Sequence, residues 1–501
     1  MRIPLDRQSE VPLYQQIETY LRQGILSGSL AAETRLPASR QLARDLGVNR
    51  ITVESAYAVL ETDGLIYSRM GSGTYVLPPN PLSAFSKDKP GNAWPLWQRG
   101  LAPDKGFEAT SSGGASRRDS RHSKLISFAS GIGDAHLFPA EDFRKVLQTV
   151  MRRDGIVALD YGEPNGHAPL RETITHILAS QGLQTRSENV LITAGSQQAL
   201  SLVSQLLLKP GDVIMVESPT YSGALELFRA LGFKVVGVPV DRHGMQVEAL
   251  ETLLQQHHPK LIYTIPTFHN PTGTCLSSQR RIQLIVLADR YNIPILEDDF
   301  VGDLRYEGRA QPALKALDPG GRVIYVSTFS KILMPGLRVG FLVAEGPIYD
   351  RLVNFKRVND LATSTLIQRA LEVYVTVGRY QSYLRRSCQL FRKRRDAMLS
   401  AIGRYLPTEI HLDPPQGGLF IWMKLPGSLS SDQLLPLAWE EGVDFSPGGG
   451  FFSDGLEGKN WLRLNFVAQA PDQIEEGIQR LGRAMKRSLA ASYKLCTKAS
   501  F

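Results

Sequence analysis

Short apolar runs rich in β-branched residues alternate with helix-length segments over residues 125–488. The runs read NVLITAG, DVIMVES, KVVGVPV, LIYTIP, IPILEDD, VIYVSTF and VGFLVAE along the chain. Such runs, separated by helical segments, are typical of β-α-β units. This part of the chain is therefore predicted to be an α/β domain with a mostly parallel sheet and flanking helices.

Residues 1–78 show a different, helical pattern. Leu42, Ala43 and Leu46 lie on one helical face, and Gly47 is expected to end that helix. Asn49 is placed to cap a second helix. That helix has a predicted buried stripe at Val53, Ala56, Tyr57 and Leu60. The stretch GLIYSRMGSGTYV then predicts two short strands around a Gly-Ser-Gly tip. The pattern indicates a helix-turn-helix followed by a wing.

Composition separates these two regions. Residues 79–124 are rich in Pro, Gly, Ser, Lys and Arg and lack periodicity, which predicts a flexible basic linker. Residues 489–501 are expected to form a C-terminal tail. The formal net charge is +8, but charges nearly cancel over residues 1–79. Charge alone therefore permits a polyanionic partner without assigning DNA binding to the N-terminal unit.

Composition also bears on the cellular compartment. The three cysteines are far apart in the sequence and form neither a disulfide framework nor a zinc pattern. We find no apolar run long enough to span a bilayer and no signal-peptide pattern. A cytoplasmic protein without a metal site is expected.

The segment VSTFSKILMPGLRVGFL holds one lysine, Lys331, close to hydroxyl residues and to Arg338. Taken alone, a Ser-x-x-Lys of this kind favours a loop whose charged residues face water. Other polar residues follow predicted strands: Tyr221, Asn270 and Asp298. Gly195, Ser196 and Gln197 open a helix, whose N-terminal amides suit a phosphate. The order of these stretches favours a cofactor site over a solvated loop.

The N-terminal motifs resemble the winged helix-turn-helix of the GntR superfamily, through PLYQQIETYLRQGILSG, LPASRQLARDLGVNR and GSGTYV. This resemblance implies DNA contacts by Arg40 and Arg50, and contacts by the wing near Gly71 and Gly73. Thr52 also lies at the start of the second helix, where recognition helices meet base edges. A protein-interaction module is the alternative for a three-helix unit.

The second region resembles fold-type I pyridoxal-phosphate enzymes, the aspartate aminotransferase superfamily, which adds a smaller C-terminal subdomain. The resemblance implies a covalent bond between Lys331 and the cofactor, and contact of Asp298 with the ring nitrogen. Asn270 would bond the ring hydroxyl, and Tyr221 would stack on the ring. The implied phosphate ligands are Gly195, Ser196, Gln197, Thr328, Ser330 and Arg338.

Three further positions depend on this resemblance. Tyr161 matches a tyrosine that reaches the phosphate of the partner subunit, which implies a homodimer. Arg463, in WLRLNF, matches the arginine that binds a substrate carboxylate. Phe300 departs from the tyrosine usual at its position, which leaves Asn270 as the expected partner of the ring hydroxyl and puts full catalytic power in doubt.

The order of domains resembles the MocR-type transcriptional regulators. The resemblance implies a regulator in which the second domain senses pyridoxal phosphate or an amino-compound effector. An active aminotransferase with an appended DNA-binding domain is the alternative. The sequence names neither effector nor operator. The basic run RRSCQLFRKRRDAM, residues 385–398, is either a solvated helix face or a second DNA-contacting surface.

Overall fold

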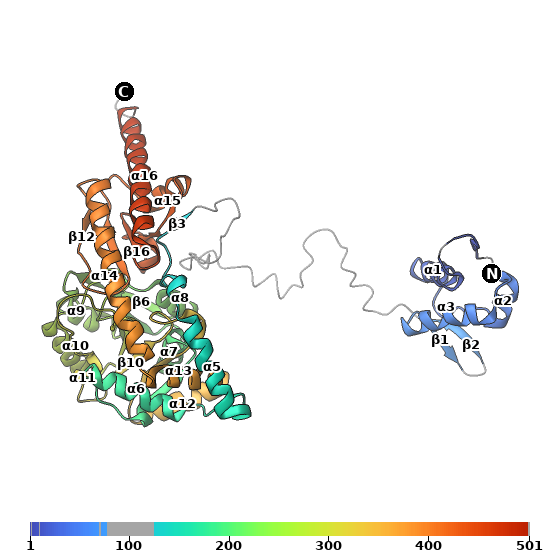
Figure 1. Cartoon of the computed structure of the whole chain (residues 1–501). Helices are drawn as coiled ribbons and strands as arrows, with labels where there is room; N and C mark the ends of the chain where they lie inside the picture. The colour runs from blue at the N-terminus through green and yellow to red at the C-terminus, as the bar shows by residue number, and fades with distance from the viewer. Residues whose placement is uncertain (2, 10, 70–71, 78–124, 499–501) are drawn as a thin grey trace. The chain divides into compact units, whose positions relative to one another are not determined.

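The computed structural model describes residues 1–77, except 2, 10, 70 and 71, and residues 125–498 (Figure 1). The chain divides into two compact units, Met1–Glu108 and Ala109–Phe501, and each is described by itself. The predicted linker, residues 79–124, lies outside the described residues. No helix of the described residues is long and apolar enough to cross a membrane.

The N-terminal unit has the predicted helix-turn-helix and wing. Its elements are α1 (Leu13–Leu26), α2 (Ser39–Leu46), α3 (Arg50–Thr62), β1 (Ile66–Arg69) and β2 (Gly73–Val76). Gly47 ends α2 with φ 64°, and the Asn49 side chain accepts a hydrogen bond from the backbone N–H of Ile51. The predicted stripe on α3 is buried against α1 and α2. β1 and β2 pair antiparallel.

An eight-stranded sheet forms the centre of the second unit, in the order β4-β11-β10-β9-β8-β5-β6-β7. Its strands are β4 (Val190–Thr193), β5 (Val213–Ser218), β6 (Lys234–Asp241), β7 (Gly244–Met245), β8 (Leu261–Thr264), β9 (Ile295–Asp299), β10 (Val323–Thr328) and β11 (Gly340–Val343). Neighbours from β6 through β10 pair parallel, whereas β11 and β7 run antiparallel to their neighbours. The predicted, mostly parallel sheet is confirmed, and each of the seven predicted runs contains a strand.

Successive residues of each strand face opposite sides of the sheet and join two separate cores. On β5, Ile214 and Val216 belong to the larger core, and Met215 belongs to the smaller one. The helices α9 (Val247–His257) and α10 (Ser278–Tyr291) cover the smaller core. The opposite face is covered by α5 (Ala140–Asp154), α6 (Ala168–Ser180), α7 (Ser196–Leu207), α8 (Ser222–Ala230) and α13 (Thr365–Thr376) (Figure 1).

A second, four-stranded sheet forms the smaller subdomain, in the order β12-β13-β16-β15. Its strands are β12 (His411–Leu412), β13 (Phe420–Lys424), β15 (Ser446–Pro447) and β16 (Trp461–Asn465). The short strands β3 (Ile126–Ser127) and β14 (Val443–Asp444) pair beside it. Its helices are α15 (Ser431–Glu440) and α16 (Pro471–Lys498). The predicted domain end at residue 488 falls inside α16.

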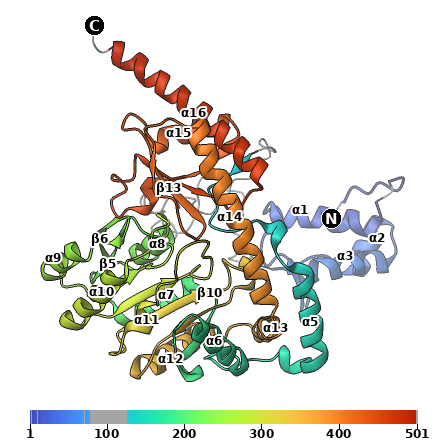
Figure 2. The ribbon, with the colours of Figure 1, turned by 60° about the vertical axis from the view of Figure 1, so that its left-hand side comes forward.

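Three further helices belong to the described fold: α11 (Leu314–Leu317), α12 (Pro347–Asp360) and α14 (Arg379–Tyr405). Figure 2 shows α14 running from the level of the large sheet to that of the small sheet. The carboxyl ends of parallel strands meet at one edge of a sheet, where open α/β sheets bind ligands. Residues that follow β5, β8, β9 and β10 are thereby placed close together.

Candidate functional site

The site begins with two neighbouring strands of the large sheet. β9 and β10 pair parallel, and Asp298 lies opposite Val326 in the register. Lys331 follows the end of β10 by three residues. The sheet therefore brings Lys331 and Asp298 to the same edge, as expected from the order of the motifs.

Asp298 is buried and has one engaged and one free oxygen. The hydroxyl of Tyr263, on β8, donates a hydrogen bond to Asp298 Oδ2 at 2.9 Å. Asp298 Oδ1 is buried and has no hydrogen-bond partner among the described residues. Burial raises the pKa of Asp298 to about 7, against the lowering effects of the Tyr263 bond and of Lys331. A cation or an N–H donor placed at Oδ1 would satisfy this atom and favour the ionised carboxylate.

Lys331 lies in a setting that favours a neutral amine. Burial lowers the pKa of Lys331 to about 8, and the positive charges of Arg463 and Arg338 contribute to this lowering, while Asp298 opposes it. A neutral amine is the nucleophilic form that attacks an aldehyde. Lys331 is thus suited to bond covalently to a carbonyl group.

Arg338 and the start of α7 form a cationic cradle near Lys331. Arg338 has φ 49° and donates to the backbone oxygen of Ala194 at 3.1 Å and to Ser330 Oγ at 3.4 Å. A Cβ at Gly195 would lie 2.8 Å from Arg338 Nη2, so glycine there permits close approach of the guanidinium. The N-terminus of α7 adds partial positive charge. Together these groups provide a site suited to a phosphate dianion.

The other predicted phosphate ligands lie at this cradle. Ser196 and Gln197 are the first residues of α7, and Gln197 Nε2 donates to the backbone oxygen of Gly223 at 3.0 Å. The hydroxyl of Thr328 donates to the backbone oxygen of Val339 at 3.2 Å and accepts from the backbone N–H of Ser330. The Thr328 hydroxyl hydrogen is therefore engaged in shaping the loop.

Arg463 is a buried arginine beside Asn270. It is 3% exposed, and its Nη1 donates to Asn270 Oδ1 at 3.0 Å. Its Nη2 donates to the backbone oxygen of Ala129 at 2.8 Å and to Ser446 Oγ at 3.2 Å. Within the described part of the chain, its Nε–H has no partner and no ion pair involves Arg463. The guanidinium is thus buried there without a counter-charge.

The surroundings of Arg463 are aromatic. Its guanidinium lies 4.1 Å from the ring centroid of Phe420 and 4.9 Å from that of Phe451. Burial lowers the pKa of Arg463 to about 9, and the charge of Tyr221 opposes this. A buried cation without a counter-charge costs free energy, which the contacts with the two rings offset in part and a bound carboxylate would offset further. This arrangement suits the predicted anion-binding role.

Tyr221 and Asn270 lie beyond the ends of their strands, and Tyr161 lies on the surface of the unit. Tyr221 precedes α8, and burial and the charge of Asp298 raise the pKa of its hydroxyl. Asn270 is buried, 5% exposed. Tyr161 is 84% exposed, and its backbone N–H donates to Asp160 Oδ1 at 2.7 Å. The role of Tyr161 toward a partner subunit stays a prediction.

The sequence did not identify Tyr263 or Ser446 as site residues. Tyr263 lies on β8, which pairs with the strand that carries Asp298. A tyrosine in a strand that pairs with the strand of Asp298 indicates a hydrogen bond to that carboxylate. The sequence alone does not give the strand order, so this indication could not be used. Phe300 is buried in the larger core and supplies no hydroxyl. Tyr263 donates its hydrogen bond to Asp298. It therefore does not replace the bond to the ring hydroxyl that a tyrosine at position 300 was expected to make.

The residues predicted to contact DNA lie at the starts of α2 and α3 and at the wing. Arg40 is exposed on the first turn of α2, and Thr52 is half-buried in α3. Arg50 Nε forms an ion pair with Glu54 Oε1 at 2.6 Å. Gly73 begins β2 with φ 121°, and a Cβ there would lie 2.9 Å from Arg35 Nε. Gly71 lies outside the described residues. Arg35, which the sequence analysis did not single out, lies beside the wing.

Comparison with known proteins identifies both units. Residues 13–76 match the gntR family of bacterial regulatory proteins, and residues 124–481 match aminotransferase class I and II. The chain is 32% identical over 486 residues to the probable rhizopine catabolism regulatory protein MocR of Rhizobium meliloti, covering 96% of this chain and 95% of MocR. The chain belongs to the MocR-type transcriptional regulators. This MocR-type chain carries a DNA-binding domain and an aminotransferase domain.

The aminotransferase domain of this MocR-type regulator is also similar to free-standing enzymes. A 2-aminoadipate transaminase of Thermus thermophilus is 38% identical over 371 residues, which cover 73% of this chain and 91% of the enzyme. The solved structure of LysN, an α-aminoadipate aminotransferase from the same species, has a TM-score of 0.70 at 38% identity. The match covers 74% of this chain and 94% of LysN, whose structure was determined with N-(5'-phosphopyridoxyl)-L-leucine.

The unpartnered Oδ1 of Asp298, the cradle beside Arg338 and the buried Lys331, whose pKa is lowered to about 8, fit the ring nitrogen, phosphate and aldehyde of pyridoxal phosphate. Family, related structure and site thus support pyridoxal phosphate as the cofactor of this MocR-type chain.

Proposed function

We propose that this regulator senses an amino compound that also carries an anionic group. The supporting observation is Arg463, a buried guanidinium that lacks a counter-charge among the described residues and acts electrostatically on Lys331. A ligand with an amine and a carboxylate or sulfonate would place its anion at Arg463 and its amine toward Lys331. The planar guanidinium of Arg463 can donate two parallel hydrogen bonds, so a planar carboxylate fits it best.

Pyridoxal phosphate supplies an aldehyde for amines and a ring that withdraws electrons. The chain's own residues fix its position. Arg338, Ser330 and the first turn of α7 would hold the phosphate, and Asp298 Oδ1 would accept a hydrogen bond from the ring nitrogen. Arg463 orients the amide of Asn270, because Arg463 Nη1 donates to Asn270 Oδ1. The NH₂ group of Asn270 then remains available to donate. Anion binding at Arg463 would therefore also alter the ring contact made by Asn270.

A homodimer is part of this proposal. Exposed apolar side chains gather in one short stretch before Tyr161: Ile156, Val157 and Leu159 are 83%, 56% and 61% exposed. Contiguous apolar exposure of this kind marks an interaction surface. A second copy covering this stretch would bury it and bring Tyr161 near the partner's site.

Transamination is a second candidate. It is favoured by the likeness to a transaminase and by the pKa of Lys331, about 8, which lets the freed amine carry a proton near neutral pH. Phe300 in place of the expected tyrosine argues for weakened turnover, because one expected hydroxyl is missing. Sensing of pyridoxal phosphate alone, without an amine effector, is a third candidate. No contact among the described residues favours it over the other two.

A spectroscopic titration separates these candidates. The purified protein, loaded with pyridoxal phosphate, is titrated with acidic α-amino acids, ω-amino acids and amino sulfonates while the visible absorbance is followed. We expect saturable changes with anionic amines only. Lys331→Ala is the control, because it retains the cradle but loses the covalent bond. Sustained keto-acid production would favour the enzyme, and no response to any amine would favour the cofactor sensor.

A further inference from the structure

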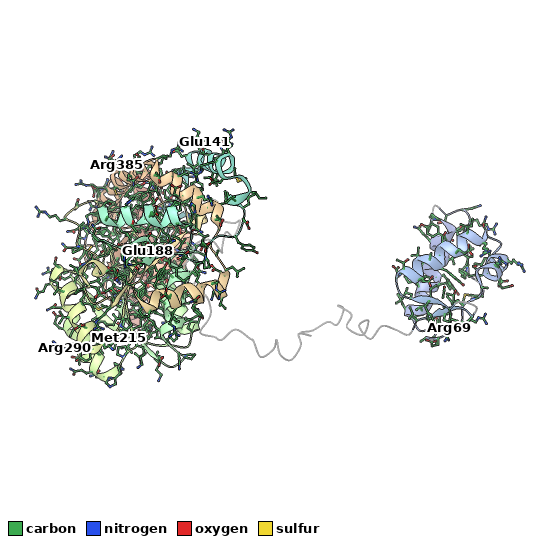
Figure 3. The ribbon with its side chains drawn as sticks, turned by 90° about the horizontal axis from the view of Figure 1, so that it is seen from below. Arg69, Glu141, Glu188, Met215, Arg290 and Arg385 are labelled. Carbon is green, nitrogen blue, oxygen red and sulfur yellow. The ribbon has the colours of Figure 1, made fainter. Side chains whose placement is uncertain are left out.

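The peptide that opens the phosphate cradle is held on both of its sides. Ala194 follows β4, whose other end lies beside Glu188, a residue labelled in Figure 3. The backbone oxygen of Ala194 accepts from Arg338 Nη2 at 3.1 Å, and its backbone N–H donates to Gln198 Oε1 at 2.8 Å. Gln198 lies in the first turn of α7. Its side chain therefore sets the direction of the peptide that leads into Gly195.

The turn that Ala194 enters has little room to shift. Gly195 has φ 92°, and a Cβ on Gly340 of β11 would lie 2.7 Å from the backbone carbon of Gly195. Thr193 Oγ1 donates to the backbone oxygen of Gly195 at 3.0 Å. The backbone N–H groups at the start of α7 follow this turn, so a displaced Ala194 peptide would misplace them toward a phosphate.

Asp360, the last residue of α12, fixes the orientation of the Gln198 amide. The helices α12 and α7 pack against each other, and Gln198 Nε2 donates to Asp360 Oδ2 at 2.7 Å. An ionised carboxylate accepts hydrogen bonds and donates none, so the NH₂ side of the amide must face it. The amide oxygen is thereby directed to Ala194. With a neutral amide at position 360, both orientations of Gln198 would find a partner, and one of them would release Ala194.

A buried lysine supplies the counter-charge for Asp360. Lys356 is 0% exposed, and its Nζ donates to Asp360 Oδ1 at 2.8 Å. It forms no other ion pair among the described residues. The two carboxylate oxygens therefore have separate partners, since Oδ1 faces the lysine and Oδ2 faces Gln198. Because the charges of the pair cancel, it adds little repulsion toward a phosphate in the cradle.

Stabilisation of α12 gives little reason for this ion pair. Asp360 lies at the carboxyl end of α12, where the helix dipole disfavours an acid. A lysine four residues before an acid is also the weaker order of such a pair. Burial of the ammonium group adds a desolvation cost. The other contact of the carboxylate, the bond to Gln198, therefore indicates the role of the pair.

The backbone directly after Asp360 is strained. Leu361 has φ 62° and ψ −67°, and the backbone N–H of Ala362 donates to the backbone oxygen of Asp360 at 2.7 Å. These are the features of a γ-turn that is unfavourable for a residue with a side chain. Such strain persists where the surrounding contacts fix the chain. The strained turn thus agrees with a position of Asp360 that is set by its contact with α7.

We propose that Asp360 is a positioning residue for the phosphate of pyridoxal phosphate. Lys356 orients the carboxylate of Asp360, which holds Gln198, and Gln198 holds the backbone of Ala194 where the cradle begins. Asp360 acts on the cradle through Gln198 and does not contact the cofactor. The hold on the phosphate does not depend on an amine effector, so this role and the proposed function can fail separately.

The test compares pyridoxal phosphate with pyridoxal, because the two share the ring and the aldehyde and differ in the phosphate. The cofactor is removed from the full chain, and each compound is titrated back while the visible absorbance is followed. Gln198→Met keeps both charges of the ion pair, and Asp360→Asn keeps the shape of the carboxylate. We expect each variant to lose about tenfold in affinity for pyridoxal phosphate and less than about twofold for pyridoxal.

Two controls separate positioning from folding. Lys315→Met removes another buried lysine of this unit, whose Nζ lies 3.8 Å from Glu345 and has no hydrogen bond to the cradle among the described residues. Its affinity for both compounds should match that of wild type. The double variant Gln198→Met/Asp360→Asn should lose no more than the larger single loss, because both changes break the same chain of hydrogen bonds.

Three results would overturn the proposal. Equal losses of affinity for pyridoxal phosphate and pyridoxal would show a general loss of packing. Unchanged affinity of Gln198→Met for pyridoxal phosphate would reject the role of the amide, and this variant decides the case even if Asp360→Asn folds poorly. Additive losses in the double variant would show that Asp360 does not act through Gln198.

Discussion

The hydroxyl of Tyr263 donates a hydrogen bond to Asp298 Oδ2 at 2.9 Å, between adjacent strands of the large sheet. This bond holds one oxygen of the carboxylate and leaves the other, Oδ1, buried and without a partner in the described residues. It also lowers the pKa of a carboxyl group that burial raises to about 7. Tyr263 therefore orients the carboxyl group expected to face the ring nitrogen and favours its ionised form.

Tyr263→Phe should weaken the hold on pyridoxal phosphate. Without the hydroxyl, the pKa of Asp298 rises further and the ring nitrogen loses its ionised partner, at a cost of about 1–3 kcal/mol. The measurement is the dissociation constant of the cofactor, together with the visible absorbance of the bound form. Tyr325→Phe is a matched control, because Tyr325 donates to the neighbouring Asp299 at 2.8 Å from the adjacent strand. Equal cofactor loss in both variants would show a general packing effect instead.

Removal of the Lys331 charge should change how stability depends on pH. The pKa of Lys331 is lowered from 10.5 to about 8 in the folded, cofactor-free chain. Between these values the unfolded chain binds more protons, so the free energy of unfolding should rise with pH from about 8 to 10.5. Lys331→Met should be more stable below pH 8 and lose this rise. Chemical denaturation across that range tests it, and parallel curves for both proteins would refute the burial of the amine.

Arg50→Ala should weaken operator binding and leave the cofactor's absorbance unchanged. If Arg50 contacts a guanine edge, the loss should be about 1–3 kcal/mol and largest on the cognate site. Glu54 holds Arg50 Nε, so Glu54→Gln is informative: it frees the guanidinium and removes a negative charge near DNA, and affinity should rise. Binding is measured by fluorescence anisotropy. A uniform loss on all sequences would make Arg50 a phosphate contact.

Effector binding and DNA binding should be coupled. If an anionic amine shifts DNA affinity, DNA must shift effector affinity by the same factor, typically about 5–150-fold. Arg463→Ala should remove this shift while leaving basal DNA binding intact, because the anion loses its partner. Arg463→Lys is the control that keeps the charge but loses the fork. Effector titrations with and without operator DNA measure the shift. If the midpoint of the effector titration of wild type is the same with and without operator DNA, the two domains are uncoupled.

The sequence predicted the strands and helix starts well because local signals determine them. Gly47 and Asn49 terminate and cap their helices through their own backbone and side chain. Each predicted strand run contains a strand, since a parallel sheet buries such runs on both faces. Lys331 and Asp298 were placed together because their strands are adjacent.

Other features depend on contacts distant in sequence. Tyr263 became a site residue only through the pairing of β8 with β9. Arg394 and Arg395 looked like surface charges, yet acceptors far along the chain bury them. The Thr328 hydroxyl resembles a phosphate ligand, but Val339 engages it. No local pattern encodes these partners.

The length of α14 has a mechanical consequence. At 1.5 Å per residue, its 27 residues form a continuous rod of about 40 Å. Its far end packs with α16 of the smaller subdomain, whose sheet carries Arg463. Its near end contacts α5, where Arg379 Nη1 donates to the backbone oxygen of Asp142. A hydrogen-bonded helix is stiff, so a small rotation of the subdomain at one end becomes a larger displacement at the other. If the subdomain rotates when an amine binds, as the proposed function requires, α14 would carry that rotation to a surface remote from the site.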